Sequence, residues 1–159
     1  KLGGTAQLVH APLFVEDKQQ RDVLMNVASI RDVFDLARQA TVALVGIGSV
    51  QAPGSGYYDL LPDPARGSQA LMDAGIAGEF LAHLIRADGS LADSDLNSRV
   101  VALDPQQLAN CPSVIGVAAG ELKAGPVSAA LAGRFLTSLV VDEEIAKALE
   151  SLGKDYTNE

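Results

Sequence analysis

Apolar and polar residues follow one another along this chain in blocks that predict a sheet with helices between its strands. Three runs are almost wholly apolar, at Thr41–Ser49, Val114–Gly120 and Leu139–Asp142. Strands that are apolar on both faces are typical of a parallel sheet that is covered on both sides. A helix is predicted through Val127–Leu131, between the last two runs, and it completes a strand–helix–strand unit.

The remaining segments predict further elements with weaker patterns. Gln7–Val15 is mostly apolar, and we expect a short strand that ends at Pro12, because proline cannot donate to a β-ladder. Ser29 is expected to cap a helix whose buried face is Val33, Phe34, Leu36 and Ala37. We also expect a helix at Ala65–Ala74, a tight turn at Gly75–Glu79, a strand at Asn97–Leu103, a short helix from Pro105, and a terminal helix at Glu143–Leu152 with Ala146, Leu149 and Leu152 inside.

Two connections have recognisable turn chemistry. Ala87-Asp88-Gly89 stands between Phe80–Ile85 and Ser90–Ala92, and Asp-Gly between two such runs predicts a hairpin. A Gly/Pro-rich stretch at Pro53–Pro64 predicts a long loop, which in a compact domain is usually functional or mobile.

Together these elements predict one α/β domain at residues 1–152 and a polar tail at 153–159. The sheet is expected to be mainly parallel, with helices on both faces and an inserted β-hairpin. The 159 residues suit a single core, and no stretch of the sequence has the composition of a linker.

Composition narrows the classes of function. The formal net charge is −8, from 12 basic and 20 acidic residues, so this chain should repel phosphate backbones and anionic lipid. The single cysteine, Cys111, excludes an internal disulfide and is expected to be a small buried hydrophobe. Two histidines do not make a metal site, and no cofactor motif is present. No apolar run reaches membrane-spanning length and no signal peptide is visible, so we expect a cytoplasmic protein.

Gly46-Ile47-Gly48-Ser49 ends the clearest strand and is the first candidate for ligand contact. It is not a dinucleotide fingerprint, because Gln51 stands where the third glycine is required, and no P-loop Gly-Lys-Ser/Thr follows. The segment is either a tight turn after a strand or a backbone that lets a ligand approach closely.

Glu79 and Lys123 are the two charged candidates, and each follows a glycine-rich segment. Glu79 can accept hydrogen bonds from sugar hydroxyls, or it can cap a turn. Lys123 precedes a predicted helix, where a cation is unfavourable unless an anion is also bound, so a contact with phosphate is the alternative to a solvated lysine. No Ser/His/Asp set, carboxylate pair or Cys/His couple is recognisable, so no enzymatic nucleophile or base is identified.

Six motifs in order resemble the effector domain of the SorC family of bacterial transcriptional regulators. They are Leu8–Pro12, Val42–Gly48, Ala74–Glu79 followed by Asp88-Gly89, Leu96–Val100, Gly116–Lys123 and Leu139–Asp142. The match runs from about residue 1 to 152. Ala119 stands where the family often has a second glycine, and Thr41 where an aspartate is common.

The resemblance implies a fold like that of glucosamine-6-phosphate deaminase and ribose-5-phosphate isomerase. It implies a pocket for a sugar or sugar phosphate, a homodimer or homotetramer, and DNA binding only through an N-terminal helix-turn-helix domain outside these residues. It also implies that the first α/β portion of the effector domain lies outside them. The alternative is a sugar-phosphate isomerase or deaminase that retains catalysis. The resemblance carries over two effector contacts, Glu79 and Lys123. The full set of predicted effector-binding residues is Pro12, Gly46, Gly48, Ser49, Gly78, Glu79, Phe80, Gly120 and Lys123.

Overall fold

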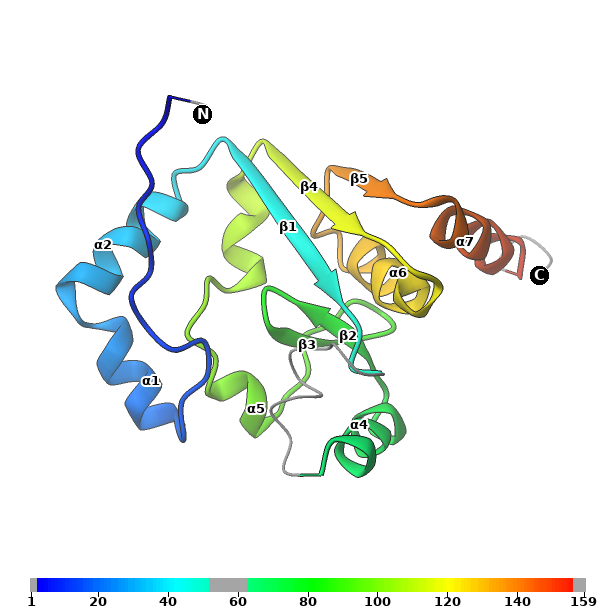
Figure 1. Ribbon diagram of the computed structural model, residues 1–159, viewed down its shortest axis with the longest axis horizontal. Coiled ribbons are helices and arrows are strands. Elements are labelled where there is room, and N and C mark those ends of the chain that lie inside the picture. Colours follow the sequence, from blue (N-terminus) through cyan, green and yellow to red (C-terminus); the bar gives the residue numbers. More distant parts are fainter. Residues whose placement is uncertain (1–2, 52–62, 156–159) are drawn as a thin grey trace.

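The computed structural model describes residues 3–51 and 63–155, and the expected loop at Pro53–Pro64 lies almost wholly outside them. The described elements form a five-stranded mixed sheet with helices packed around it (Figure 1). In chain order they are α1 (Lys18–Met25), α2 (Ala28–Ala37), β1 (Val42–Gly48), α4 (Pro64–Asp73), β2 (Ile76–Phe80), β3 (His83–Arg86), α5 (Asp95–Ser98), η1 (Pro105–Asn110), β4 (Ser113–Ala118), η2 (Glu121–Lys123), α6 (Ala124–Ala132), β5 (Ser138–Val141) and α7 (Glu143–Asp155).

The sheet has the order β3-β2-β1-β4-β5 and combines two kinds of pairing. β1, β4 and β5 are parallel, with Val45 opposite Gly116 and Gly116 opposite Leu139. β2 joins the other side of β1 in the antiparallel sense and continues into β3. The three apolar runs are thus confirmed as parallel strands, and the antiparallel excursion is confirmed as well.

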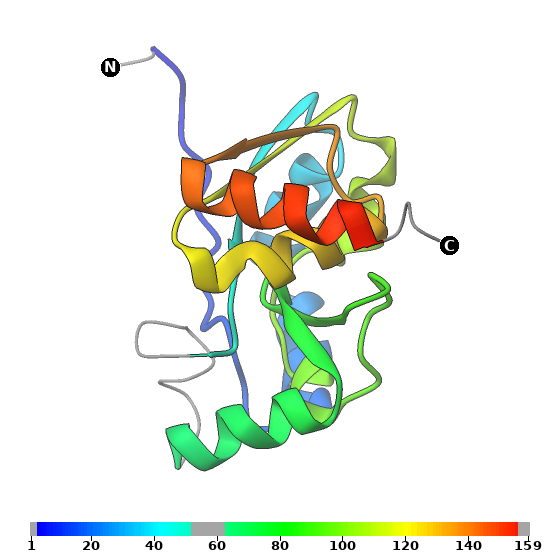
Figure 2. The same cartoon turned by 90° about the vertical axis from the view of Figure 1, so that its right-hand side faces the viewer.

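Helices cover one face of the parallel strands. α6 contacts β1, β2 and β3 and packs beside α7 (Figure 2). The core on this side gathers residues from strands and helices alike: Ile30, Phe34, Val45, Ile47, Phe80, Val114, Ala118, Val127, Ala129, Ala130 and Ile145. Cys111 belongs to the same cluster, as expected for a buried hydrophobe.

The opposite face of these strands is exposed among the described residues, which corrects the expectation of helices on both faces. Register places one set of side chains on this face, and we call it the open face: Val42, Leu44, Gly46, Ser113, Ile115, Val117, Ser138 and Val140. Leu44 is 73% exposed and Val140 56%. A parallel sheet normally buries both faces, so this surface is unusual for the fold class.

The hairpin differs from its prediction. Ile76–Phe80 is a strand, whereas Gly75–Glu79 was expected to be a turn, and the reversal falls at Leu81-Ala82. The Asp88-Gly89 turn is present, but the run after it contributes only an isolated bridge, Ile85 to Leu91. The β2–β3 pairing dominates because Phe80, Leu84 and Ile85 are all fully buried by it.

Two expected strands are absent from the described residues. The Gln7–Val15 segment makes a single bridge, Phe14 to Val100, and residues 3–10 are exposed. Asn97–Leu103 begins instead in α5, because the Ser94 hydroxyl accepts the Asn97 N–H and caps that turn. The Asn97 side chain then bonds to the backbone of Leu84 and Ala92, which fixes it beside β3.

Helix ends and buried faces also shift. α2 begins after Val27, Ser29 lies inside it, and its buried residues are Ile30 and Phe34, while Leu36 is 54% exposed. α7 continues to Asp155, beyond the expected end at Leu152, and buries Ile145, whereas Ala146 and Leu152 are exposed. The helices at 64–73, 105–110 and 124–132 are confirmed. No helix in the described part of the chain is long and apolar enough to cross a membrane.

Candidate functional site

Glu79 lies at the carboxyl end of β1, which is where ligands bind in open α/β sheets. It pairs with Gly48 in the antiparallel β1–β2 register, next to the pair Ile47 and Phe80. Ile47 and Phe80 point into the core, so Gly48 and Glu79 face the other way, toward the open face. The Glu79 side chain lies over Gly48 so closely that a Cβ at position 48 would be 1.9 Å from Oε1.

The second oxygen of this carboxylate is already bound. Glu79 Oε2 accepts the Ala82 N–H at 2.8 Å, across the hairpin turn. Burial raises the pKa of Glu79, and the hydrogen bond from Ala82 and the nearby charge of Lys123 partly oppose this increase. A half-buried carboxylate with one oxygen held in place can accept a hydrogen bond from a ligand at the other oxygen.

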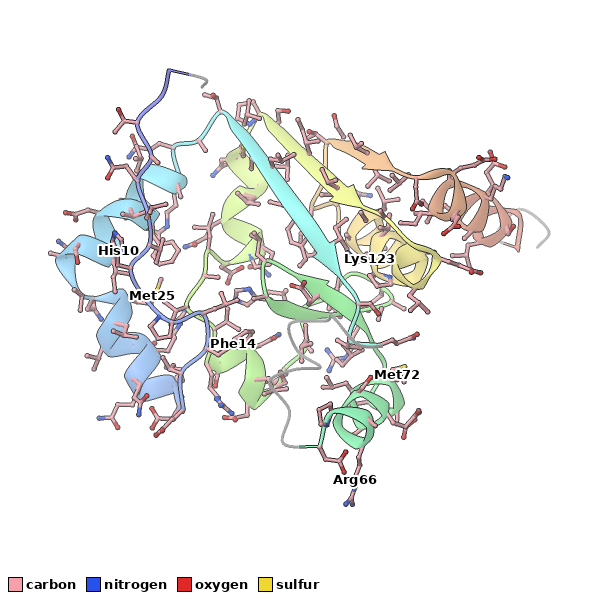
Figure 3. The ribbon with its side chains drawn as sticks, in the orientation of Figure 1. His10, Phe14, Met25, Arg66, Met72 and Lys123 are labelled. Atoms are coloured by element: carbon pink, nitrogen blue, oxygen red, sulfur yellow. The ribbon has the colours of Figure 1, made fainter. Side chains whose placement is uncertain are left out.

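Lys123 lies at the same edge of the sheet, after a different strand, β4. It ends η2, the turn that follows β4, and its side chain is half-buried at the start of α6 (Figure 3). Its charge acts on Glu79, yet none of the ion pairs between described residues joins the two side chains. The charge of Lys123 therefore acts on Glu79 without a direct ion pair between the two side chains.

A second carboxylate at this edge was missed by the sequence reasoning. Asp142 follows β5 and accepts two backbone N–H groups, that of Gly120 at 2.6 Å and that of Ile145 at 3.0 Å. The bonds from Ile145 and Gly120 lower the pKa of Asp142. They also tie the loop before Lys123 to the start of α7. The sequence signal that could have identified Asp142 is its position directly after a predicted parallel strand.

The other predicted site residues lie in different surroundings. Gly48, Ser49 and Gly120 lie at the carboxyl ends of β1 and β4, but Ser49 is buried and its hydroxyl accepts the Gln51 N–H at 3.0 Å. Gly46 lies on the open face. Phe80 and Gly78 are buried as well. Phe80 is fully covered and stacks on Phe135 with ring centroids 5.1 Å apart. A Cβ at Gly78 would be 2.5 Å from Pro126 Cβ, so this glycine allows α6 to approach β2.

Pro12 is not brought to this edge. Its neighbours Leu13 and Phe14 contact the 100–101 segment, and Figure 3 shows His10 and Phe14 well away from Lys123. The segment that contains Pro12 runs on the side of α1 and α2.

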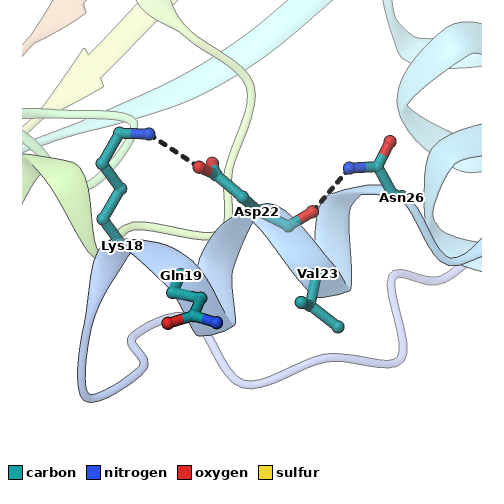
Figure 4. A pocket seen from close by; sticks show the side chains of 5 residues that line it. All are labelled: Lys18, Gln19, Asp22, Val23 and Asn26. Atoms are coloured by element: carbon teal, nitrogen blue, oxygen red, sulfur yellow. Dashed lines mark hydrogen bonds and ion pairs between the residues drawn. The ribbon is translucent and has the colours of Figure 1, made fainter.

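Two surface hollows lie away from Glu79 and Lys123, and neither is lined by a predicted site residue. One lies along α1, where Lys18 pairs with Asp22 at 2.6 Å and the Asn26 amide donates to the Asp22 carbonyl at 2.8 Å (Figure 4). The other lies at the amino end of β4, lined by Cys111, Phe135 and Thr137 among others. No group of three or more potential metal ligands occurs in residues 3–51 and 63–155.

The molecule is an α/β domain with a carboxylate and an ammonium group at the carboxyl ends of its parallel strands, the edge at which open α/β sheets bind ligands. Comparison with known proteins gives the family. Residues 1–150 match the model of the sugar-binding domain family, Sugar-bind, and the chain belongs to this family.

The relatives and structural neighbours that it matches are regulatory proteins. The transcriptional regulator LsrR of Enterobacter sp. (strain 638) is 32% identical over 150 residues, which are 93% of this chain and 46% of that protein. The erythritol catabolism regulatory protein EryD of Brucella abortus (strain 2308) is 29% identical over 153 residues, 94% and 46% of the two chains.

Solved structures agree with this assignment. The full-length sorbitol operon regulator SorC of Klebsiella pneumoniae superposes with a TM-score of 0.77 at 25% identity, over 87% of this chain and 44% of that one. The sugar-binding domain of a Vibrio fischeri transcriptional repressor gives 0.79 at 27% identity, over 96% and 60%. The chain therefore spans about half the length of the regulators that it matches.

Proposed function

We propose that this domain binds a sugar or sugar phosphate as an effector and performs no chemistry on it. The observation that supports the proposal is that Glu79, on β2 opposite the last residue of β1, and Lys123, in the turn after β4, lie at the carboxyl ends of these two parallel strands, and that the charge of Lys123 acts on Glu79. A carboxylate suits the hydroxyls of a polyol, and an ammonium group suits a phosphate. Sorbitol and erythritol, named in two of the relatives, are both polyols.

In this proposal the effector alters DNA binding by another part of the regulator. The relatives are about twice as long as this chain, and the chain is acidic, with a net charge of −8. We place DNA contact in a helix-turn-helix domain outside these residues, in a cytoplasmic homodimer or homotetramer. We further propose kinship with the glucosamine-6-phosphate deaminase and ribose-5-phosphate isomerase fold.

A thermal-shift panel of sugars, polyols and their phosphates tests the proposal. A ligand present at 100 times its Kd adds about 2.7 kcal/mol to the free energy of unfolding, which is readily detected. Isothermal calorimetry then gives the affinity of each hit. Hits that are consumed or isomerised during incubation, as followed by NMR, would favour the enzymatic alternative. A panel without any stabilising compound would contradict the proposal.

Lys123→Ala tests the role of the ammonium group. It should weaken a phosphorylated effector by about 1.5–3 kcal/mol, the range for a hydrogen bond to a charged group, and leave the unphosphorylated form nearly unaffected. Lys147→Ala is the matched control, because Lys147 is exposed on α7, away from the candidate site, and pairs with the exposed Glu143. Equal binding by the Lys123→Ala variant and the parent would remove Lys123 from the site.

A further inference from the structure

The hairpin turn beside Glu79 has a conformation that its residues do not favour. Leu81 and Ala82 have φ values of 51° and 61°, in the left-handed region. Two-residue hairpin turns with both residues there normally contain Asn, Asp or Gly, because a Cβ is unfavourable in this conformation. Contacts from neighbouring side chains must therefore hold the turn.

Two side chains brace the turn from its two sides. Glu79 Oε2 accepts the Ala82 N–H at 2.8 Å, and the buried His83 ring donates from Nδ1 to the Leu81 carbonyl at 2.8 Å. Leu81 also packs against the main core. The Ala82 N–H is thus fixed relative to β2, and it in turn fixes one oxygen of the Glu79 carboxylate.

Gly48 provides the space for the other oxygen. The nearest atoms to a Cβ built at position 48 would be Oε1, Cδ and Cγ of Glu79, at 1.9, 2.6 and 2.8 Å. Any larger residue at this position would displace the carboxylate. Gly46 lies two residues earlier on the same strand and the same face, and no atom of the described residues lies within 4 Å of a Cβ built there.

We infer that Gly48 and the Leu81-Ala82 turn are positioning elements that hold Glu79 Oε1 in one direction for an effector hydroxyl. The inference rests on the proposed function for its ligand. A fixed acceptor favours the hydroxyl that points toward it, so these elements set the preference between sugar epimers. Gly48 and Ala82 act through Glu79 and need not touch the effector themselves.

The placement of Glu79 can be tested without any ligand. In the parent, the NMR amide signal of Ala82 should shift with pH as the Glu79 carboxyl titrates, and Glu79→Gln should abolish that shift. Gly48→Ala should abolish it as well, because the added methyl displaces the carboxylate. Gly46→Ala adds the same methyl to open space and should leave the titration unchanged.

These variants are expected to fold. The atoms nearest to the new methyl in Gly48→Ala belong to the flexible end of the Glu79 side chain, which can swing aside. Glu79→Gln adds no volume, so it provides a second test that does not depend on the tolerance of position 48.

The ligand test uses two epimers of a polyol found in the thermal-shift panel. Gly48→Ala should reduce the ratio of their affinities by about tenfold, the scale of one lost hydrogen bond to a charged group. Gly4→Ala adds the same methyl at an exposed residue outside the candidate site and should preserve the ratio. An unchanged Ala82 titration and epimer ratio in Gly48→Ala would overturn the inference. If the titration behaves as expected but the parent binds no compound in the panel, the placement of Glu79 stands and the proposed function fails.

Discussion

At the scale of single residues, the two carboxylates of the candidate site respond to the fold in opposite ways. Glu79 is half-buried, and burial raises its pKa above the ordinary value of 4.5. Asp142 is held by two backbone N–H groups, which lower its pKa below 3.8. Oε1 of Glu79 can accept a further hydrogen bond, whereas both oxygens of Asp142 already accept backbone N–H groups.

This contrast predicts a pH dependence for Glu79. At pH values between 4.5 and the higher pKa of the folded state, Glu79 has lost its proton in the unfolded chain but still holds it in the folded chain. Rising pH therefore favours unfolding through this group. Relative to Glu79→Gln, the parent should be most stable below pH 4.5 and lose that advantage as pH rises through the folded pKa. Urea unfolding at a series of pH values measures the difference, and a flat difference would contradict the expectation.

Asp142 should show the opposite sign. Because the folded-state pKa of Asp142 is lowered, its contribution to the free energy of unfolding is fully present above pH 3.8. That contribution is lost as the pH falls through the folded-state pKa. The parent should therefore be more stable than Asp142→Asn at neutral pH, with the gap closing in acid. The same unfolding series detects this, and a gap that widens in acid would show that the Gly120 and Ile145 bonds do not favour the charged form.

At the scale of elements, β2 joins the core to the candidate site through alternate side chains. Glu79 faces the site, and its neighbour Phe80 is fully buried against Phe135. Phe80→Ala should lower the free energy of unfolding by about 3–5 kcal/mol through lost burial and a cavity. Leu44→Ala is the control, because Leu44 is 73% exposed, and it should change stability by less than about 0.5 kcal/mol. Similar losses for the two variants would contradict the packing.

The elements that the sequence predicted well are those whose pattern is complete within the segment. β1, β4 and β5 are continuous apolar runs, and α6 follows from its small apolar residues. The β2–β3 hairpin was misplaced because its turn, Leu81-Ala82, has no turn chemistry and depends on Glu79 and His83 for support.

The candidate site stays a prediction, and its residues differ in how far the sequence alone indicates their placement. Gly48, Glu79 and Lys123 follow from their positions at the ends of extended runs. Phe80 was assigned to the pocket, but its side chain points into the core. The face on which it lies is fixed by its pairing with Ile47, and the sequence of one strand does not specify that pairing. Asp142 was missed because its partner Gly120 is distant in the sequence.

At the scale of the whole molecule, charge predicts how this chain behaves toward nucleic acid. Its 20 acidic residues outnumber the 12 basic ones, so it should give no sequence-specific gel shift with operator DNA at physiological salt. Competition with unrelated DNA across a salt series is the measurement. A salt-sensitive, sequence-specific shift would place DNA contacts within these residues.

The open face has a thermodynamic consequence for the chain studied on its own. Unfolding raises the heat capacity mainly by exposing apolar surface to water, and Val42, Leu44, Val117 and Val140 already contact water in the folded state. Scanning calorimetry should therefore give a heat-capacity increment below the usual value of about 12–15 cal/mol/K per residue. With a smaller increment, the free energy of unfolding curves less with temperature, so this chain should lose stability more gradually on cooling than a domain of equal length with both faces covered.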